Sequence, residues 1–130
     1  MNLDLIFDTH SFIWWADEPM KLSQAALAAL ENEDNRLFVS DVSIWEIQVK
    51  VQLGKVKLKF SLEDLLESQQ RNNEVKILPI TTEHILALNN LPFHHKDPFD
   101  RLLIAQSIVE GFSIVTADSE FPAYPAKLLW

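Results

Sequence analysis

Cysteine is absent from this 130-residue sequence, glycine occurs only twice, and no long hydrophobic run is present. A chain without cysteine has neither a disulfide framework nor a thiolate zinc site, which fits a reducing cytoplasm. Two glycines also argue against a loop-rich all-β fold. No stretch approaches the roughly 18 apolar residues of a membrane span, and no basic region precedes the first apolar stretch. We therefore expect a cytoplasmic protein that is neither exported nor inserted into a membrane.

Positive charge is also scarce. The chain has 11 Lys and Arg residues against 19 Asp and Glu residues, which gives a formal net charge of −8. This balance counts against a protein that coats nucleic acid through basic side chains, but it allows a nuclease whose metal ions meet the phosphate. One narrow basic patch is formed by Lys50, Lys55, Lys57 and Lys59. This patch is either a nucleic-acid contact or a solvated helix end.

Length and composition indicate one domain over residues 1–130. The chain is 48% hydrophobic and 23% charged, which is typical of a soluble globular protein. Its length is sufficient for one buried core, and no linker or internal repeat interrupts it.

Short apolar runs alternate with helix-forming segments along the chain. Strands are expected at 3–7, 36–39, 75–78, 113–116 and, at an edge, 127–129. Helices are expected over 23–30, from 43 to about 54, from 61 onward, over 82–89, and over 101–110 after the opening Asp97-Pro98. This alternation predicts an α/β fold, an α/β/α sandwich whose central, mainly parallel sheet has four to five strands.

Four acidic residues are placed to meet at one edge of this sheet. Asp8 follows the first strand and Asp118 the fourth, while Glu46 and Asp100 are expected in the first turns of their helices. Loops and helix N-termini converge beyond the carboxyl ends of parallel strands, where ligands bind. Crowded carboxylates repel one another unless some are protonated or a divalent cation neutralises them. An all-oxygen set favours Mg²⁺ or Mn²⁺ over zinc, and such an ion activates water for attack on a phosphodiester.

Each carboxylate also has a purely structural interpretation. Glu46 lies three residues after Ser43 and would complete a capping box. Asp97 is a good helix cap, and Asp100 would favour the helix dipole. The two aspartates that follow strands are common turn residues. The joint placement of all four, and not any one of them, predicts the metal site.

Four segments of the chain resemble the PIN domain family, and the resemblance runs nearly end to end. The most specific is Asp97–Gln106, which reads DPFDRLLIAQ; the others are Asp8-Thr9-His10, Ser43–Ile47 and Val115–Asp118. The resemblance implies a catalytic metal site of Asp8, Glu46, Asp100 and Asp118, with Thr116 and Asp97 as supporting residues.

Members similar to this chain in length and motif are mostly VapC-type toxins of type II toxin–antitoxin systems. The resemblance therefore implies an endoribonuclease that hydrolyses RNA with Mg²⁺ or Mn²⁺, a cognate antitoxin that holds it inactive, and a homodimer. The acidic balance leaves the path of the RNA open. The candidate RNA contacts that flank the acidic motif are His94, His95, Lys96 and Arg101, although loop histidines and a helix-start arginine are commonly exposed without a function.

Three tryptophans lie near the predicted site. Trp14 and Trp15 are adjacent, so they point in different directions on a helix and one of them is a candidate interface residue. Trp45 is expected to be packed in the core or in a groove.

Two other functions stay open at this point. One is a PIN nuclease that acts in RNA processing or on DNA without an antitoxin, and toxicity relieved by a neighbouring gene would separate it from a toxin. The other is a catalytically idle binding module. The presence of all four carboxylates argues against the idle module, because a site without activity has no need for crowded negative charge.

Overall fold

The computed structural model describes residues 2–130 and contains one five-stranded sheet in which every neighbouring pair is parallel. The strand order is β3-β2-β1-β4-β5. The strands are β1 (Asp4–Phe7), β2 (Arg36–Ser40), β3 (Lys76–Leu78), β4 (Ser113–Val115) and β5 (Lys127–Leu129). The expected α/β sandwich is confirmed, with five strands and no antiparallel pair among them.

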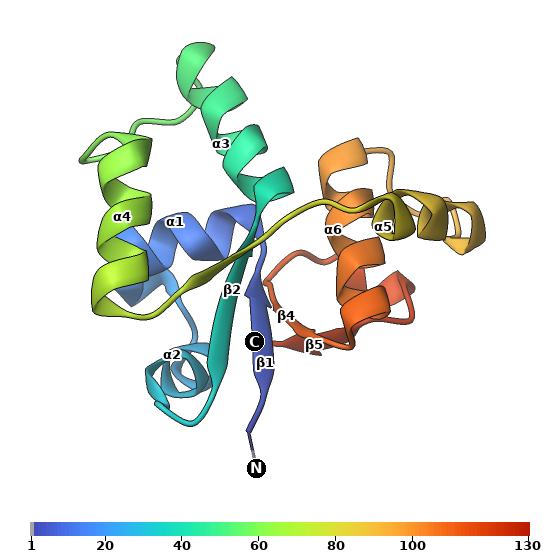
Figure 1. Cartoon of the computed structure of the whole chain (residues 1–130), viewed down its shortest axis with the longest axis horizontal. Coiled ribbons are helices and arrows are strands. Elements are labelled where there is room, and N and C mark those ends of the chain that lie inside the picture. Colours follow the sequence, from blue (N-terminus) through green and yellow to red (C-terminus); the bar gives the residue numbers. More distant parts are fainter. Residues whose placement is uncertain (1) are drawn as a thin grey trace.

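Six α-helices connect and cover the strands (Figure 1). They are α1 (Thr9–Asp17), α2 (Gln24–Glu31), α3 (Asp41–Gln52), α4 (Leu62–Asn72), α5 (Thr82–Ala87) and α6 (Pro98–Glu110). Short 3₁₀ turns occur at Pro19–Lys21, Leu88–Asn90 and Phe121–Ala123. Within residues 2–130, no helix has the length and apolar character that crossing a membrane requires.

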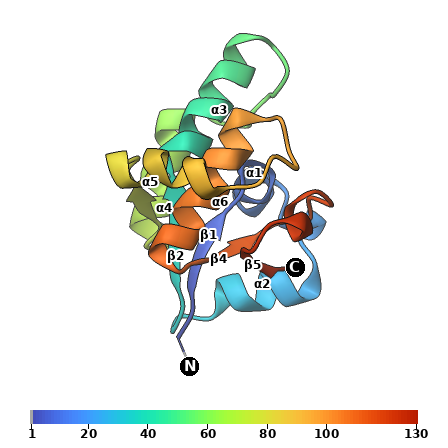
Figure 2. The same ribbon diagram turned by 90° about the vertical axis from the view of Figure 1, so that its right-hand side faces the viewer.

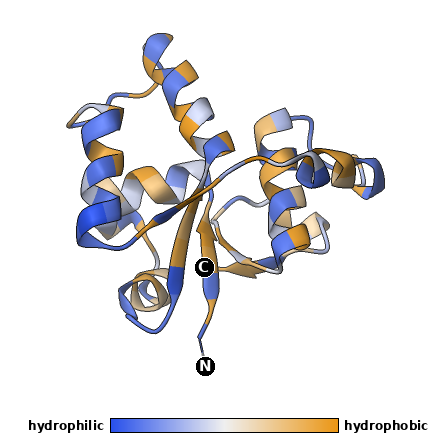
Figure 3. Cartoon of the chain, in the orientation of Figure 1, coloured by the Kyte–Doolittle hydropathy of each residue, from blue (hydrophilic) through white to orange (hydrophobic). Residues whose placement is uncertain are grey.

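Alternation along the strands divides the core into two clusters, one on each face of the sheet. In β1, Leu5 and Phe7 pack with α1, α2 and α4, whereas Ile6 packs with α6. The same division is seen in Figure 1, where α1, α2 and α4 lie on one side of the sheet and α5 and α6 on the other. The central strands β1, β2 and β4 are buried on both faces, so they are largely hydrophobic, while α4 is mostly hydrophilic (Figure 3).

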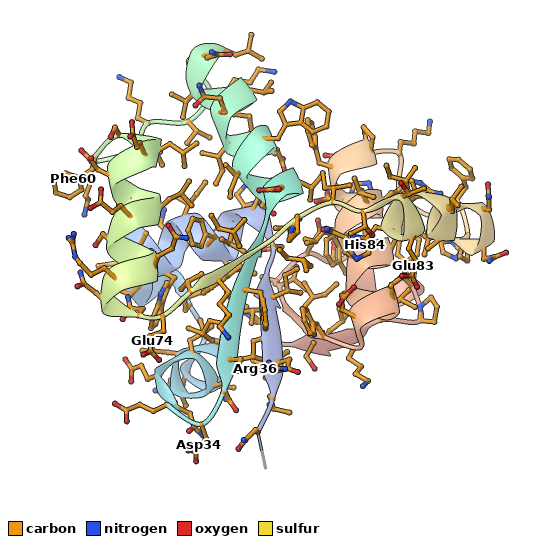
Figure 4. All side chains as sticks on the ribbon, in the orientation of Figure 1. Asp34, Arg36, Phe60, Glu74, Glu83 and His84 are labelled. Atoms are coloured by element: carbon orange, nitrogen blue, oxygen red, sulfur yellow. The ribbon has the colours of Figure 1, made fainter. Side chains whose placement is uncertain are left out.

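Helix α3 stands at the junction of the two faces and supplies Ile47 to one cluster and Val42 to the other. Figures 1 and 2 both show α3 and the segment after it at the end of the molecule opposite the start of β1. The hydroxyl of Ser40 caps α3 through the amide of Val42 and also donates to the buried Gln106 of α6. Nε2 of Gln106 in turn lies 3.3 Å from Nδ1 of His84, which belongs to α5 (Figure 4). This buried polar chain fixes the start of α3 against α6.

The order in which strands are added to the sheet changes sides at β1. From β1 it adds β2 and β3 on one side, and it later returns to place β4 and β5 on the other. Such a switch point leaves a crevice between the carboxyl ends of the two central strands. Phe7 pairs with Val115 there, so Asp8 and Thr116 are the first residues beyond the two strand ends.

Helix α1 was not among the helix ranges predicted along the chain, although Trp14 and Trp15 were considered as helical residues. Its nine residues, THSFIWWAD, contain aromatic and β-branched side chains with low helix propensity. Asp8 supplies the cap, and burial of Phe12 beneath the sheet stabilises the helix.

Candidate metal centre

The carboxylate of Asp8 is held in place at the end of β1 by three donors. Its Oδ1 accepts the amide of Ser11 at 2.8 Å and a short hydrogen bond from the Ser11 hydroxyl, and its Oδ2 accepts the hydroxyl of Thr116 at 2.6 Å. The residue is buried, and burial raises the pKa of Asp8, whereas the hydrogen bonds from Ser11 and Thr116 oppose the rise. Asp8 therefore caps α1 and also directs its charge into the crevice.

Thr116 joins the two aspartates that follow the central strands. Its hydroxyl donates to Asp8 and accepts the amide of Asp118 at 3.0 Å. Oδ1 of Asp118 accepts the amide of Glu120, which makes Asp118 a turn residue as well. Asp118 can therefore be both a turn residue and a carboxylate of the site, and the same holds for Asp8, which caps a helix.

Glu46 reaches the same place from α3. The expected capping box with Ser43 is wrong, because Ser40 caps the helix and the first helical residue is Asp41. Glu46 therefore lies in the second turn and not the first. Ser43 is buried, and its hydroxyl has no hydrogen-bond partner among residues 2–130.

The carboxylate of Glu46 is buried and bound at both oxygens. Oε1 accepts the hydroxyl of Thr9, the residue after Asp8, at 2.6 Å. Oε2 accepts Nζ of Lys50, one turn along α3, at 2.6 Å. This hydrogen bond to Glu46 raises the pKa of the Lys50 ammonium. Glu46 is therefore tied to the end of β1 by Thr9 and partly neutralised by a cation from its own helix.

Asp100 is a half-buried carboxyl whose pKa is strongly raised. Asp97 caps α6, as expected, and accepts the amides of Phe99 and Asp100, which puts Asp100 in the first turn. Burial, followed by the charges of Asp97 and Glu46, raises the pKa of Asp100 to about 7; Asp118 adds to the rise and His95 opposes it. Burial and nearby negative charge therefore both disfavour the ionised form of Asp100, and His95 offsets this only in part.

His95 lies inside this acidic cluster and not on an exposed loop surface. Its Nε2 is 3.0 Å from Asp100, 2.9 Å from Glu120 and 3.9 Å from Asp118. Its Nδ1 accepts the amide of Asp97 at 3.1 Å, which leaves the proton of the neutral ring on Nε2. The Nε2–H of His95 therefore lies among these carboxylates, and the oxygens remain the ligand atoms for a cation.

The other residues expected to contact RNA differ in their exposure to solvent. Arg101 is buried, because its guanidinium donates to the main-chain oxygen of Pro92 at 2.8 Å and stacks on the ring of Phe93 at 3.8 Å. It supports the loop before α6 and is not a free surface group. His94 and Lys96 are exposed beside the site.

The tryptophans also differ in their exposure and contacts. Trp45 is 56% exposed, with its ring edge-on to Phe99 at 4.8 Å, so it does not lie in the core. Trp15 packs on Phe7 and donates from Nε1 to Gln69. The partner of Trp14 is Trp130, at 5.9 Å between ring centroids.

The donor set at this edge fits a hard divalent cation. The four carboxylates come from β1, β4, α3 and α6, and one ligand atom each of His95, Asp100 and Asp118 lie within 4.8 Å of one another. A divalent ion would relieve the repulsion that raises the pKa of Asp100, and an all-oxygen set matches Mg²⁺ or Mn²⁺.

Several residues of the site were not identified from the sequence. They are Ser11, Thr9, Lys50 and Glu120. Thr9 and Lys50 lie close to predicted carboxylates, but nothing in their spacing says which carboxylate each would contact. The available signal for Lys50 was its position four residues after Glu46, because side chains at this spacing are neighbours on a helix.

Comparison with known proteins relates this arrangement to a nuclease family. The family model described as PIN domain matches residues 5–127. The ribonuclease VapC22 of Mycobacterium tuberculosis is 32% identical over 115 residues, which cover 88% of this chain and 86% of the relative. The structure of VapBC2 from Rickettsia felis bound to a promoter DNA fragment superposes with a TM-score of 0.74 at 16% identity, over 97% of each chain. FitAcB from Neisseria gonorrhoeae gives a TM-score of 0.58 at 16% identity, over 95% of each chain. At these identities the two structures show likeness of fold.

Proposed function

The chain belongs to the PIN domain family, and we propose that it is a metal-dependent endoribonuclease that acts as the toxin of a toxin–antitoxin pair. The observation that carries the proposal is the raised pKa of Asp100, about 7, caused by burial and by the nearby charges of Asp97, Glu46 and Asp118. The relative from M. tuberculosis, which is named a ribonuclease, supports RNA as the substrate.

The four carboxylates are proposed as the ligands of Mg²⁺ or Mn²⁺ and as the catalytic residues. A bound ion of this kind supplies positive charge against the phosphodiester and lowers the pKa of water. Thr116 holds Asp8 and Asp118 in register, and Thr9 holds Glu46 to the end of β1. Asp97 fixes the first turn of α6, which presents Asp100.

The first test is cleavage of mixed cellular RNA by the purified, partner-free protein with Mg²⁺, with Mn²⁺ and with EDTA. We expect discrete fragments with metal and none with EDTA. Asp100→Asn keeps the shape of the side chain and removes its charge, so we expect it to abolish cleavage. Circular dichroism should show that the variant is folded.

Asp64→Asn is a matched control for this variant. Asp64 occupies the same third position of its helix, after the capping Ser61, but it is exposed and lies in α4, away from the site. It should cleave as the unmodified chain does. Equal cleavage by Asp100→Asn and Asp64→Asn would remove Asp100 from the mechanism, and no cleavage by folded, antitoxin-free protein would reject the ribonuclease.

A cognate antitoxin and a homodimer complete the proposal, together with a place in the cytoplasm, where a toxin meets cellular RNA. Support comes from structural neighbours described as VapBC2 and FitAcB, and from exposed apolar side chains such as Ile85, Leu86 and Phe93. Growth arrest on expression, relieved by the neighbouring gene, would identify the antitoxin. Light scattering of the isolated chain would measure the oligomer.

A further inference from the structure

Cationic side chains are concentrated in one part of this acidic protein. Four of the 11 Lys and Arg residues lie between Ile47 and Phe60, a segment that contains none of the 19 acidic residues. The segment comprises the rest of α3 after Glu46 and the loop that leads to α4. This segment therefore attracts phosphate, while the carboxylates of the site repel it.

The lysines of the loop share one exposed side. Lys55, Lys57 and Lys59 are exposed, whereas the intervening Val56 and Leu58 are half-buried. In residues 2–130, Lys55 and Lys57 form no ion pair with a carboxylate. Lys59 donates from Nζ to the main-chain oxygen of Asp17 at 2.8 Å, which anchors the loop to the end of α1. The three lysines therefore form an exposed strip of positive charge, which we call the lysine strip.

The lysine strip is continuous with the acidic site through Lys50. Nζ of Lys50 binds Glu46 at 2.6 Å, and its main-chain oxygen accepts the amides of Lys55 at 2.8 Å and Val56 at 3.3 Å. From Glu46 to Gln52 the helix rises by about 9 Å. Figures 1 and 2 show that this part of α3 and its loop project from the body of the molecule.

Stabilisation of the C-terminus of α3 by positive charge does not explain the positions of the lysines in the strip. Lys50 is in the last turn of α3 and benefits from the helix dipole, but that effect falls off within the last turn. The lysines of the strip lie beyond Gln52, where α3 ends. An aromatic ring accompanies them, because Phe60 is 68% exposed and points outward near the start of α4 (Figure 4). Cations beside an exposed ring are typical of surfaces that bind single-stranded nucleic acid, by phosphate contact and base stacking.

We propose that RNA runs from the acidic site along α3 and that its backbone is bound by Lys55, Lys57 and Lys59. This inference rests on the proposed ribonuclease function and names the path of its substrate. The strip supplies affinity for the backbone, and the carboxylates with their ion act on the bond that it presents to them. Lys50 lies between the two and contacts a candidate ligand, so the test leaves it unchanged.

The experiment compares two triple variants in the Asp100→Asn background, which binds RNA without cleaving it. One carries Lys55→Gln, Lys57→Gln and Lys59→Gln, and the control carries Lys21→Gln, Arg71→Gln and Lys127→Gln, which remove the same charge from other exposed surfaces. Binding of a labelled single-stranded RNA of mixed sequence is measured by fluorescence anisotropy over a series of KCl concentrations. Thermal melting checks that both variants are folded.

Three lost phosphate contacts should lower the slope of log affinity against log salt by about two, at roughly 0.7 per contact for a single strand. Affinity should fall about 100-fold near 0.1 M salt, and the difference should close toward 1 M. The control should keep the slope of the background protein. Equal slopes in both triple variants and the background would overturn the RNA path, and the strip would then suit an acidic protein segment.

Failure of the path and failure of the function give different results. If the unmodified chain cleaves RNA but the lysine variant keeps its slope, the path alone is wrong. If the unmodified chain neither binds nor cleaves RNA, the proposed function fails and the path fails with it. Equal losses in both triple variants would show an effect of net charge only, which would also overturn the path.

Discussion

At the scale of single residues, each carboxylate of the site does structural work as well. Asp8 caps α1, and Asp118 accepts an amide in the turn that follows it. Their neighbours are hydroxyl groups, which donate to a carboxylate without neutralising it. Thr116 connects the two aspartates, because its hydroxyl donates to the carboxylate of Asp8 and accepts the amide of Asp118. These hydrogen bonds therefore orient the carboxylates without neutralising their negative charge.

Replacing Thr116 by Val removes this hydroxyl while it keeps the shape of the side chain. Oδ2 of Asp8 then loses its donor, and the amide of Asp118 loses its acceptor. We expect the affinity for Mn²⁺ to fall about 10- to 100-fold, which is the usual effect of removing a residue that orients metal ligands. Isothermal titration calorimetry measures this directly. Thr116→Ser should restore most of the affinity, and an unchanged affinity in the valine variant would show that the hydroxyl does not organise the site.

At the scale of secondary structure, the N-terminus of α6 presents Asp100, and the carboxylate of Asp97 holds that first turn. Asp97→Ala should lower the free energy of unfolding by about 1 kcal/mol through loss of the cap. Ser61→Ala removes the cap of α4 and should cost about the same, because both caps bind an amide of the first turn. Only the variant at Asp97 should also weaken Mn²⁺ binding.

Urea unfolding and calorimetry separate these two effects. Asp97→Ser keeps a capping oxygen and should recover most of the stability. If Asp97→Ala and Ser61→Ala leave metal binding equally intact, the cap of α6 has no part in shaping the site.

The elements whose signals are local could be predicted from the sequence. The strands followed from short apolar runs, and the ends of α6 followed from Asp97, Pro98 and Gly111, whose φ of 74° is readily adopted by glycine. Helix α1 was missed because tertiary burial of Phe12 outweighs the weak propensity of its sequence. The start of α3 was misplaced because Ser40 and Ser43 are both good caps, and only the contact of Ser40 with Gln106 in α6 decides between them.

The meeting of the carboxylates could be predicted because topology alone brings strand ends together. The hydrogen-bond partners of each carboxylate could not be predicted, since they depend on side-chain directions in three dimensions. His95 is an example, because an exposed loop position was expected and the amide of Asp97 instead turns its ring toward Asp100. Burial of Arg101 depends likewise on the path of the loop before α6.

At the scale of the whole molecule, the crowded site reduces stability in the absence of metal. The pKa of Asp100 is raised from 3.8 to about 7, so the folded protein binds this proton more tightly than the unfolded chain. The contribution of Asp100 to stability therefore declines as the pH rises through that range. A bound ion reverses the effect, because it favours the ionised carboxylate.

Asp100→Asn should accordingly be as stable as the unmodified chain near pH 4 and more stable at about pH 8 without metal, where the unmodified carboxylate carries its charge. A gain of about 1 kcal/mol would raise the melting temperature by roughly 4 °C. Saturating Mg²⁺, at about 100 times its dissociation constant, should stabilise the unmodified chain by about 2.7 kcal/mol and leave the variant nearly unchanged. Thermal melts over pH, with and without Mg²⁺, measure all of these differences. Asp64→Asn, whose side chain is exposed, should show no gain at high pH. If Asp100→Asn were instead less stable than the unmodified chain at pH 8 without metal, the carboxylates would already be compensated within the fold, and there would be no electrostatic reason for the site to take up a cation.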